Sequence, residues 1–389
     1  MYTKRLLILF ICSIFFCCSH AQVTDALAEA DVHSLNLFNA GQWKELLTYG
    51  KKTLAAGADF PLLRMRTGYA AFILGNYSQS LKQYKKVFDD DPQNSTALYY
   101  VYLNNLYLNN TTSARYYAGK LSTETKAGEK ISSFKLAAIE TEYSYKIPTD
   151  SMRKNAQYGR LGINLQLNYK LELQQSVAIY NQKISEPRLF AVVDNRHIRV
   201  NQKEYYAKLI FAPTGNISLI GGFHYFYTPY NNFIYNNTII FGGIKYTKPF
   251  VHLKAIANLG HITESAYNQY DLTISLFPMG NTKLYFITRT AYGDQFTISQ
   301  VAGFNPVKNI WLEGNITLGK FNNLLENDAL YMYNDIDRKQ IKAGGSVYAL
   351  LSKKLTLSIN YTFEQKLKYQ SINYNFYQHS INGGLTWKF

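Results

Sequence analysis

From about Asn155 onward, apolar and polar residues alternate along the chain, most cleanly over 161–169, 251–259 and 355–363. Successive side chains of an extended strand point to opposite faces of its sheet. Each of these segments therefore predicts a strand with one apolar face and one hydrated face. Segments of about 10 residues are also long enough to cross a bilayer as tilted strands.

Short turn signals, rich in Pro, Gly and Asn or Lys, separate the predicted strands. They lie at 213–216, 248–249, 278–281, 306–309 and 352–354. The other connections are longer and more polar, and 320–338 is expected to be such a loop. Short turns that alternate with long loops are typical of an outer-membrane β-barrel.

This segmentation predicts an antiparallel transmembrane β-barrel of about 12 strands. The number is even if the first strand begins in the periplasm and the last strand ends there. The range is about 10 to 14, because 174–201 fits either one long loop or two strands. A soluble β-sandwich is the competing interpretation, since it also uses alternating strands with apolar faces turned inward.

The end of the sequence favours a transmembrane β-barrel over a soluble β-sandwich. Leu385, Trp387 and Phe389 continue an alternating strand up to a final aromatic residue. This ending resembles the terminal signature of bacterial outer-membrane β-barrels, whose last strand closes the barrel and presents a C-terminal aromatic to the insertion machinery. The resemblance implies that these three residues form a barrel terminal signal, with outer-membrane lipid and the barrel assembly machinery as partners.

Between Gln22 and about Lys146 the pattern is helical, and a Gly/Asn-containing motif recurs at 41–43, 75–77 and 109–111, a spacing of 34 residues. The middle copy, 61–94, resembles the tetratricopeptide consensus. Its matching residues are Gly68, Ala70, Gly75, Tyr77, Tyr84 and Pro92. Small Gly68 and Ala70 would let paired helices approach closely, and Gly75 would make the turn between them.

This resemblance implies a TPR-like α-solenoid that binds a periplasmic protein partner on a concave surface. An ordinary helical bundle with the same recurrence is the alternative. The stretch 127–145 is expected to be a last helix, with an apolar stripe that includes Phe134, Ile139 and Tyr143.

The first residues have the pattern of a secretory signal peptide. Lys4 and Arg5 precede an apolar run, and small residues stand before Gln22. An uncleaved anchor and a lipoprotein signal are the alternatives. The predicted organisation is a signal peptide over 1–21, a TPR-like helical repeat domain over 22–150, and an outer-membrane β-barrel over 151–389. All three cysteines lie within 1–21, so the mature chain would have none.

Most of the formal net charge of +15 falls after Asn155. Four lysines are placed on the polar, lumen-facing phase of the predicted strands: Lys170, Lys208, Lys254 and Lys342. A basic lumen would favour anions. Alternatively, these lysines snorkel at strand ends or meet lipopolysaccharide phosphates. Nucleic-acid binding is not expected, since the basic residues are spread along the strands.

No catalytic motif stands out, and neither a metal site nor a cofactor is predicted. His379 and Ser380 are adjacent, as a hydrolase pair could be, but neighbours on a strand face opposite sides and could not share a proton.

The overall plan resembles outer-membrane proteins that join periplasmic tetratricopeptide repeats to a barrel, namely exopolysaccharide export porins and YaiO-like barrels. It implies a non-enzymatic outer-membrane protein with its helical domain in the periplasm. The barrel would be a channel or exporter for a polysaccharide or another anionic solute. The alternatives are a closed barrel that anchors an envelope-assembly scaffold and, less expected, a surface enzyme acting on lipid or glycan.

Overall fold

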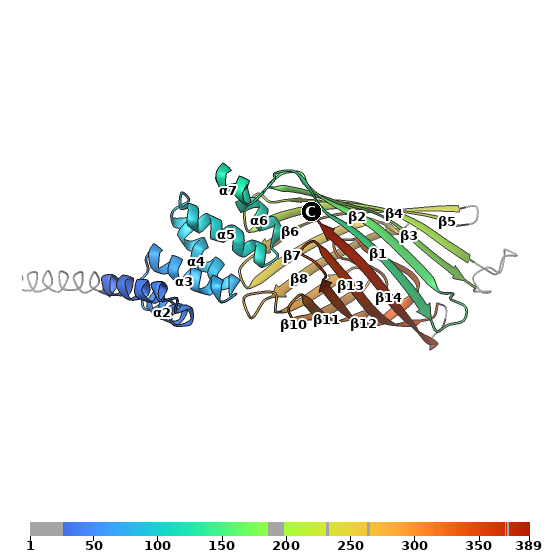
Figure 1. Ribbon diagram of the computed structural model, residues 1–389. Coiled ribbons are helices and arrows are strands. Elements are labelled where there is room, and N and C mark those ends of the chain that lie inside the picture. Colours follow the sequence, from blue (N-terminus) through green and yellow to red (C-terminus); the bar gives the residue numbers. More distant parts are fainter. Residues whose placement is uncertain (1–25, 186–197, 231–232, 263–264, 370, 372) are drawn as a thin grey trace, which may run out of the picture. The chain divides into compact units, whose positions relative to one another are not determined.

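The computed structural model describes residues 26–185, 198–230, 233–262, 265–369, 371 and 373–389. The predicted signal peptide over 1–21 and part of the ambiguous stretch 174–201 lie outside these residues. The chain divides into two compact units, one up to Asn109 and the other from Asn110 to Phe389 (Figure 1). As predicted, helices precede a closed antiparallel β-barrel.

The first unit is a series of helices. After a helix over 26–39 come α2 (Trp43–Ala55), α3 (Pro61–Ile73), α4 (Tyr77–Asp90) and α5 (Ser95–Tyr107). Asn76 and Asn94 cap α4 and α5, because each side chain accepts a hydrogen bond from a backbone N–H of the first turn. No helix in the described part of the chain is long and apolar enough to cross a membrane.

The 34-residue recurrence of the sequence is also present in the backbone. Residues Gly41, Gly75 and Asn109 all adopt left-handed φ angles, of 66°, 73° and 59°. Each is followed within two residues by the start of a helix, namely α2, α4 and α6 (Thr111–Ala118). A left-handed residue ends the preceding helix and reverses the chain, so the same turn is used three times.

Gly68 brings α3 and α4 close together. A Cβ atom at this position would lie 2.9 Å from Cε2 of Tyr84, and both Ala70 and Tyr84 are buried. Tyr77 stacks on Tyr107, with ring centroids 4.7 Å apart. Pro92 directly follows the C-cap of α4, where its missing N–H costs nothing.

The predicted helix over 127–145 is wrong. Helix α7 (Thr123–Gly128) is short, and strand β1 (Lys135–Pro148) follows it, so the barrel begins before residue 151. Tyr143 faces outward and is half exposed, whereas Glu142 lines the interior. Pairing with β2 and β14 fixes this segment as a strand, although its apolar residues also fit a helical stripe.

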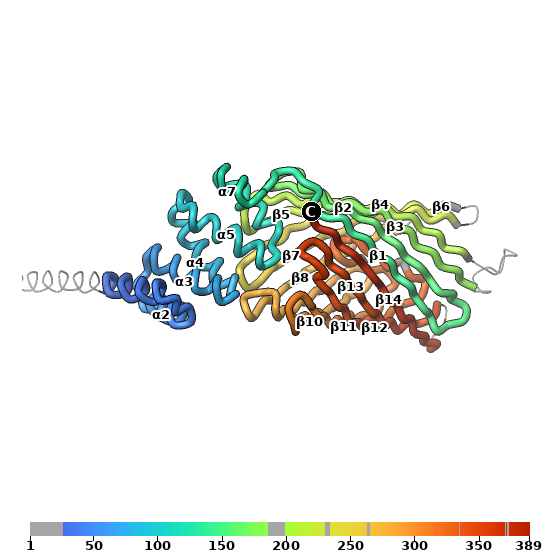
Figure 2. The backbone as a smooth tube through the Cα atoms, in the orientation of Figure 1, coloured from blue at the N-terminus to red at the C-terminus, as the bar shows by residue number. Residues whose placement is uncertain are grey.

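In the described residues fourteen strands form the barrel, within the predicted range (Figure 2). The strands after β1 are β2 (Ala156–Gln166), β3 (Leu171–Ile184), β4 (Ile198–Phe211), β5 (Ile217–Tyr230), β6 (Phe233–Thr247), β7 (Val251–Ile262), β8 (Ser265–Leu276), β9 (Leu284–Tyr292), β10 (Phe296–Val307), β11 (Ile310–Glu326), β12 (Tyr331–Leu350), β13 (Leu355–Leu367) and β14 (Asn375–Lys388). Each pairs with the next, and β14 pairs with β1 to close the ring.

The two ends of the barrel differ. All five turn signals read from the sequence connect an even-numbered strand to the following one. They therefore lie at one end, together with the start of β1 and the end of β14. We call this the turn end, and the opposite one the loop end.

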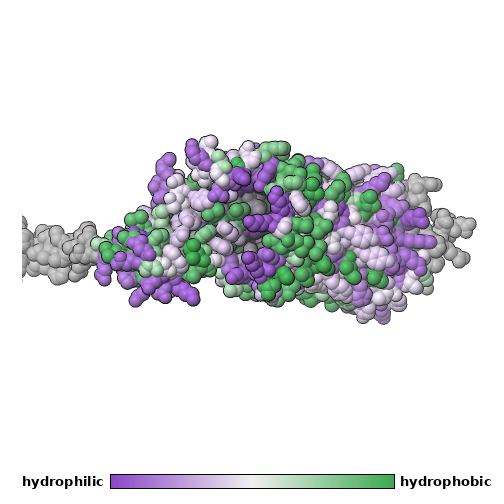
Figure 3. Space-filling view, in the orientation of Figure 1, coloured by the Kyte–Doolittle hydropathy of each residue, from purple (hydrophilic) through white to green (hydrophobic). Residues whose placement is uncertain are grey.

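The outer surface of the barrel is apolar. Outward-facing Leu161, Ile240 and Leu259 are each at least half exposed. Figure 3 shows hydrophobic side chains gathered on the barrel, with more hydrophilic ones toward the loop end. Leu385, Trp387 and Phe389 belong to this exposed surface. Such a surface needs lipid around it, as in a transmembrane β-barrel.

Candidate functional site

The expected loop over 320–338 is wrong, because β11 and β12 run through it and are joined by a turn at 327–330. We call 320–338 the lumen hairpin. Pairing of β11 with β10 ends at Leu318, and pairing of β12 with β13 ends at Arg338. In the described part of the chain, the two strands pair beyond these residues only with each other.

Gly319 marks the point where β11 leaves the barrel wall. Its φ angle is +140°, and a Cβ atom there would lie 2.7 Å from the carbonyl oxygen of Phe296. Both the backbone angle and the space therefore require glycine. The ladder is irregular at the same place, with register shifts around Phe321.

The tip of the hairpin is buried inside the barrel. Leu325 and Ala329 are only 1% and 2% exposed. They belong to one apolar cluster with inward-facing side chains of β4 to β8. The wall residues of this cluster are Tyr206, Ile220, Phe226, Ile239, Phe241, Ile256, Ile262 and Tyr267. Strand β4 lies seven strands from β11 (11 − 4 = 7) in the fourteen-strand ring, so the hairpin crosses the lumen.

Asp328 makes the main charged contacts of the tip. Its carboxylate accepts hydrogen bonds from Lys208 of β4, at 3.3 Å, and from Lys254 of β7. Its backbone carbonyl accepts a hydrogen bond from the hydroxyl of Tyr206, at 3.0 Å. Burial raises the pKa of Asp328, but the two lysines outweigh this effect and lower it to about 2.

Other polar side chains of the wall hold the tip backbone as well. The Gln269 amide donates to the carbonyl of Leu325 and its oxygen accepts from the N–H of the same residue, both at 2.9 Å. Nδ1 of His224 lies 2.7 Å from the carbonyl oxygen of Ala329. The wall thus satisfies the backbone groups that the inserted tip takes out of water.

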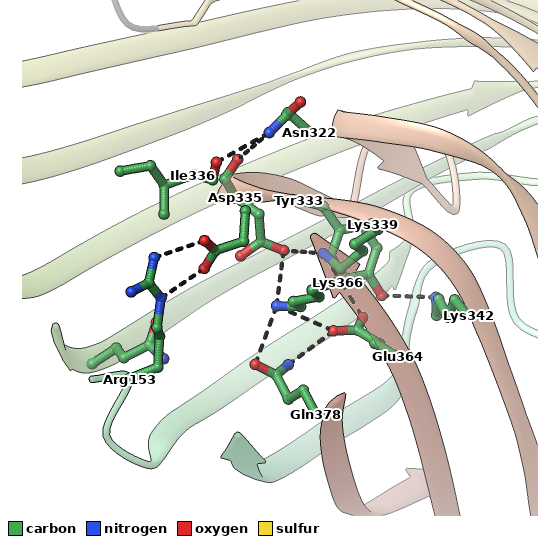
Figure 4. Close-up of polar contacts among 12 residues, drawn as sticks. Arg153, Asn322, Tyr333, Asp335, Ile336, Lys339, Lys342, Glu364, Lys366 and Gln378 are labelled. Atoms are coloured by element: carbon green, nitrogen blue, oxygen red, sulfur yellow. Dashed lines mark hydrogen bonds and ion pairs between the residues drawn. The ribbon is translucent and has the colours of Figure 1, made fainter. Parts of the chain in front are cut away.

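The base of the hairpin is held by a network of charged side chains, most of them buried (Figure 4). Asp335 pairs with Lys339 and with Lys366, which also contacts Glu364 at 3.4 Å. The neighbouring Asp337 pairs with the buried Arg153, at 2.7 Å. These contacts join β12 and β13 to the loop between β1 and β2.

A cavity of about 890 Å³ occupies the lumen. Residues 326–328 and 331–333 of the hairpin line it, and Thr111 and Thr112 of α6 line it as well. Of its charged lining residues in the described part of the chain, ten are acidic and seven are Lys or Arg. The cavity wall as a whole is therefore not basic, which argues against a lumen that selects anions by net charge.

The four lysines proposed for the lumen have different positions. Lys208, Lys254 and Lys342 line the cavity, and each pairs with an acidic residue of the hairpin, Asp328 or Glu326. Lys170 instead lies in the turn after β2, with its ammonium 5.9 Å from the ring centroid of Tyr116. Its expected place on a strand facing the lumen is wrong.

Other excess basic residues also lie in turns at the turn end. Lys248, Lys283, Lys308, Lys353 and Lys354 all occupy them.

His379 and Ser380 do not form a catalytic pair. Ser380 is buried and lines the cavity, whereas Nδ1 of His379 lies 2.7 Å from the hydroxyl of Tyr361 on the outer face. The described residues contain no group of three or more His, Cys, Asp or Glu side chains arranged to hold a metal ion.

The sequence contained two signals of the lumen hairpin that the expected loop over 320–338 left unexplained. Ile256 stands in the polar phase of 251–259, between His252 and Asn258, and it belongs to the cluster around the hairpin tip. Leu324 and Leu325 likewise interrupt the supposedly polar loop. Apolar residues on the hydrated phase of a barrel strand indicate that something is packed inside.

The fold and the hairpin-crossed lumen define a β-barrel of the outer-membrane type with an N-terminal helical part. No family model and no curated protein sequence matches the chain. Similar solved structures include a FadL homologue of Pseudomonas aeruginosa (TM-score 0.45, 8% identity, covering 74% of this chain and 94% of that chain). The TodX monoaromatic hydrocarbon channel (TM-score 0.46, 7%, 66% and 90%) and the NanC porin (TM-score 0.35, 9%, 64% and 100%) are others. At these scores the comparisons assign neither a family nor a cargo.

Proposed function

We propose that this protein is a non-enzymatic outer-membrane transport barrel whose lumen is closed at rest by the lumen hairpin. The observation that carries the proposal is the buried tip, which crosses from β11 and β12 to the opposite wall and contacts β4 to β8. A barrel that only anchors another domain has no need for a hairpin with its own polar docking site.

The contacts of the hairpin suit a reversible closure. The tip combines an apolar cluster with a set of hydrogen bonds and ion pairs to the wall. Water can replace such contacts when the hairpin moves, so each contributes modestly to the closed state. The glycine at 319 supplies the bend that lets the hairpin lie inside.

The proposed cargo is a hydrated, polar solute. The cavity is lined largely by Ser, Thr, Asn, Gln and charged side chains. A polysaccharide or another anionic solute fits the proposal if it is recognised by local groups, because the charge of the whole wall does not favour anions.

The helical unit is proposed to be a TPR-like module in the periplasm that binds a protein partner. The repeated left-handed turn before α2, α4 and α6 supports the repeat. Short turns of outer-membrane barrels lie in the periplasm, and β1 begins at the turn end, so the chain would enter the barrel from that side.

Planar-bilayer conductance of the full-length protein tests the closure. Asp328→Asn removes the counter-ion of Lys208 and Lys254, whose side chains are 13% and 26% exposed, and losing a hydrogen bond to a charged group costs about 1.5–3 kcal/mol. We expect the wild type to be almost silent and Asp328→Asn to raise the open probability by more than roughly tenfold. Asp89→Asn, the same change at an exposed position of α4, is the control and should stay silent.

A second variant makes the test independent of one side chain. Replacing 323–334 by Asn-Gly removes the tip and leaves a short turn, so this barrel should conduct continuously. Heat-modifiable migration on a gel verifies that each variant has folded. If both folded variants are silent, the transport proposal is wrong and the closed scaffold is supported.

A further inference from the structure

Three lysines meet at one place on the cavity wall. Lys208 of β4, Lys245 of β6 and Lys254 of β7 all line the cavity, and we call them the lysine triad. Lys245 and Lys254 are direct cross-strand neighbours in the β6–β7 ladder. Like charges directly opposite each other on a sheet are destabilising, so the triad requires a negative group close by.

In the described residues, Asp328 of the hairpin tip is the carboxylate that contacts the triad. Its Oδ2 atom pairs with the ammonium of Lys208, and its Oδ1 atom pairs with the ammonium of Lys254. Lys245 has no carboxylate within ion-pair distance among these residues, although it interacts electrostatically with Asp328 at longer range. Three lysines therefore share one carboxylate, and among the described residues Lys245 has no carboxylate in direct contact.

We propose that the lysine triad is an oxyanion-binding site which Asp328 occupies as an internal ligand. A small solute carrying a carboxylate or phosphate group displaces Asp328 and thereby releases the hairpin. The inference rests on the proposed closure of the lumen, and it adds the class of ligand and the way in which the ligand opens the barrel.

The geometry of the internal ligand indicates the chemistry of the solute. Each oxygen of the Asp328 carboxylate accepts from a different lysine, so the site fits an anion with at least two oxygens at carboxylate spacing. Charge-assisted hydrogen bonds of this kind are stronger than neutral ones. The third lysine gives a phosphate or a dicarboxylate an additional donor that Asp328 does not use.

The site is reachable while the hairpin is closed. The triad and Asp328 line the same cavity as Thr111 and Thr112, so a solute in the cavity meets the lysines directly. Two other cations of the cavity lie beside acids of the wall itself, since Arg160 pairs with Glu140 and Arg289 with Asp271. Their counter-ions would stay in place when the hairpin leaves, whereas those of the triad would not.

Binding of inorganic phosphate and of succinate to the full-length, detergent-solubilised protein tests the inference by isothermal titration calorimetry. In the wild type, Asp328 competes with the added anion and binding should be weak. Asp328→Asn removes the competing negative charge from the site, so both anions should bind at least roughly tenfold more tightly. Adding Lys245→Gln to this variant should weaken binding again by roughly tenfold, because the donor without a direct carboxylate partner is lost.

A matched control uses another lysine of the cavity. Lys146 lies on β1, outside the triad, so Asp328→Asn combined with Lys146→Gln should still bind phosphate and succinate tightly. Titration with sodium chloride at the same ionic strength measures simple screening. Tight binding of phosphate alone, or of succinate alone, supports the site and identifies which of the two oxyanions it takes.

Two results would overturn the inference: equal affinity in the wild type and in Asp328→Asn, or unchanged affinity after Lys245→Gln. Neither depends on conductance. If Asp328→Asn binds phosphate tightly but both tip variants are silent in bilayers, the site exists and the transport function fails. If the variants conduct but none binds these anions, the transport function stands and the oxyanion site fails.

Discussion

Gly68 illustrates how a single absent side chain determines the contact between two helices. The space for its Cβ atom is taken by the ring of Tyr84, so any larger residue forces α3 and α4 apart. Overpacking of this kind usually costs about 1–3 kcal/mol and sometimes more. We expect Gly68→Trp to make the helical unit much more sensitive to limited proteolysis in the full-length protein.

Gly128 provides the control, because no atom of the described residues lies within 4 Å of its ideal Cβ position. Gly128→Trp should leave the cleavage pattern unchanged. Equal resistance of Gly68→Trp and the wild type would contradict the close packing of α3 and α4.

The pKa of Asp328 predicts how closure depends on pH. An ordinary aspartate has a pKa of about 3.9, and the value of about 2 means that the folded, latched state stabilises the ionised form. This stabilisation is fully present above the ordinary pKa and is lost as the pH falls through about 2. Bilayer recordings should therefore show a closed wild type from neutral pH to about 4, with opening only at lower pH.

Asp328→Asn should lack this acid-dependent step. Opening of the wild type between pH 7 and 5 would contradict a closure held by the Asp328 carboxylate.

The lumen hairpin depends on a bend that L residues rarely adopt. At Gly319 the φ angle of +140° and the nearby carbonyl of Phe296 both oppose a side chain. We expect Gly319→Val to favour the state in which the hairpin is outside the lumen, and hence to raise the open probability in planar bilayers. Gly314→Val is the control on the same strand, because Gly314 has free space and an ordinary backbone angle. An equal rise in both variants would contradict the role of the bend.

Most strands could be predicted from the sequence, and two elements could not. Period-two alternation is imposed by lipid outside and water inside, so segments such as 161–169 and 355–363 were recognisable locally. The apolar residues of 138–146 fit both the helical period and the strand period. Only the pairing of this segment with β2 and β14 decides that it is a strand. The hairpin was missed because its partners, such as Phe226 and Ile256, lie far from it in sequence.

The candidate site was predictable in part. Its lysines on β4, β7 and β12 could be placed on the hydrated phase, because alternation alone defines the side of the sheet. Their counter-ions could not be predicted, since Asp328 and Glu326 reach them only after the hairpin folds inward. The net positive charge of the sequence was a poor guide to the lumen, because Lys248, Lys353 and others lie in turns.

At the scale of the whole molecule, Phe389 is expected to act in assembly more than in stability. Its side chain is 51% exposed, and its N–H donates to the carbonyl of Ala137 at 3.2 Å. Deleting it removes little from the folded barrel but takes away the proposed terminal signal. The fraction of heat-modifiable protein in outer-membrane fractions should fall, whereas Phe389→Tyr should keep it. Normal assembly without Phe389 would contradict such a signal.

The β1–β14 seam also dictates the order in which the molecule can be made. It pairs Ala138 with Lys388. Of the two strands that close the barrel, β1 is therefore synthesised first and β14 last. Until the last strand is available, β1 has a free row of N–H and C=O groups that another copy can bind. A chain interrupted within β14 would thus keep an unpaired strand edge at which copies of the protein can aggregate.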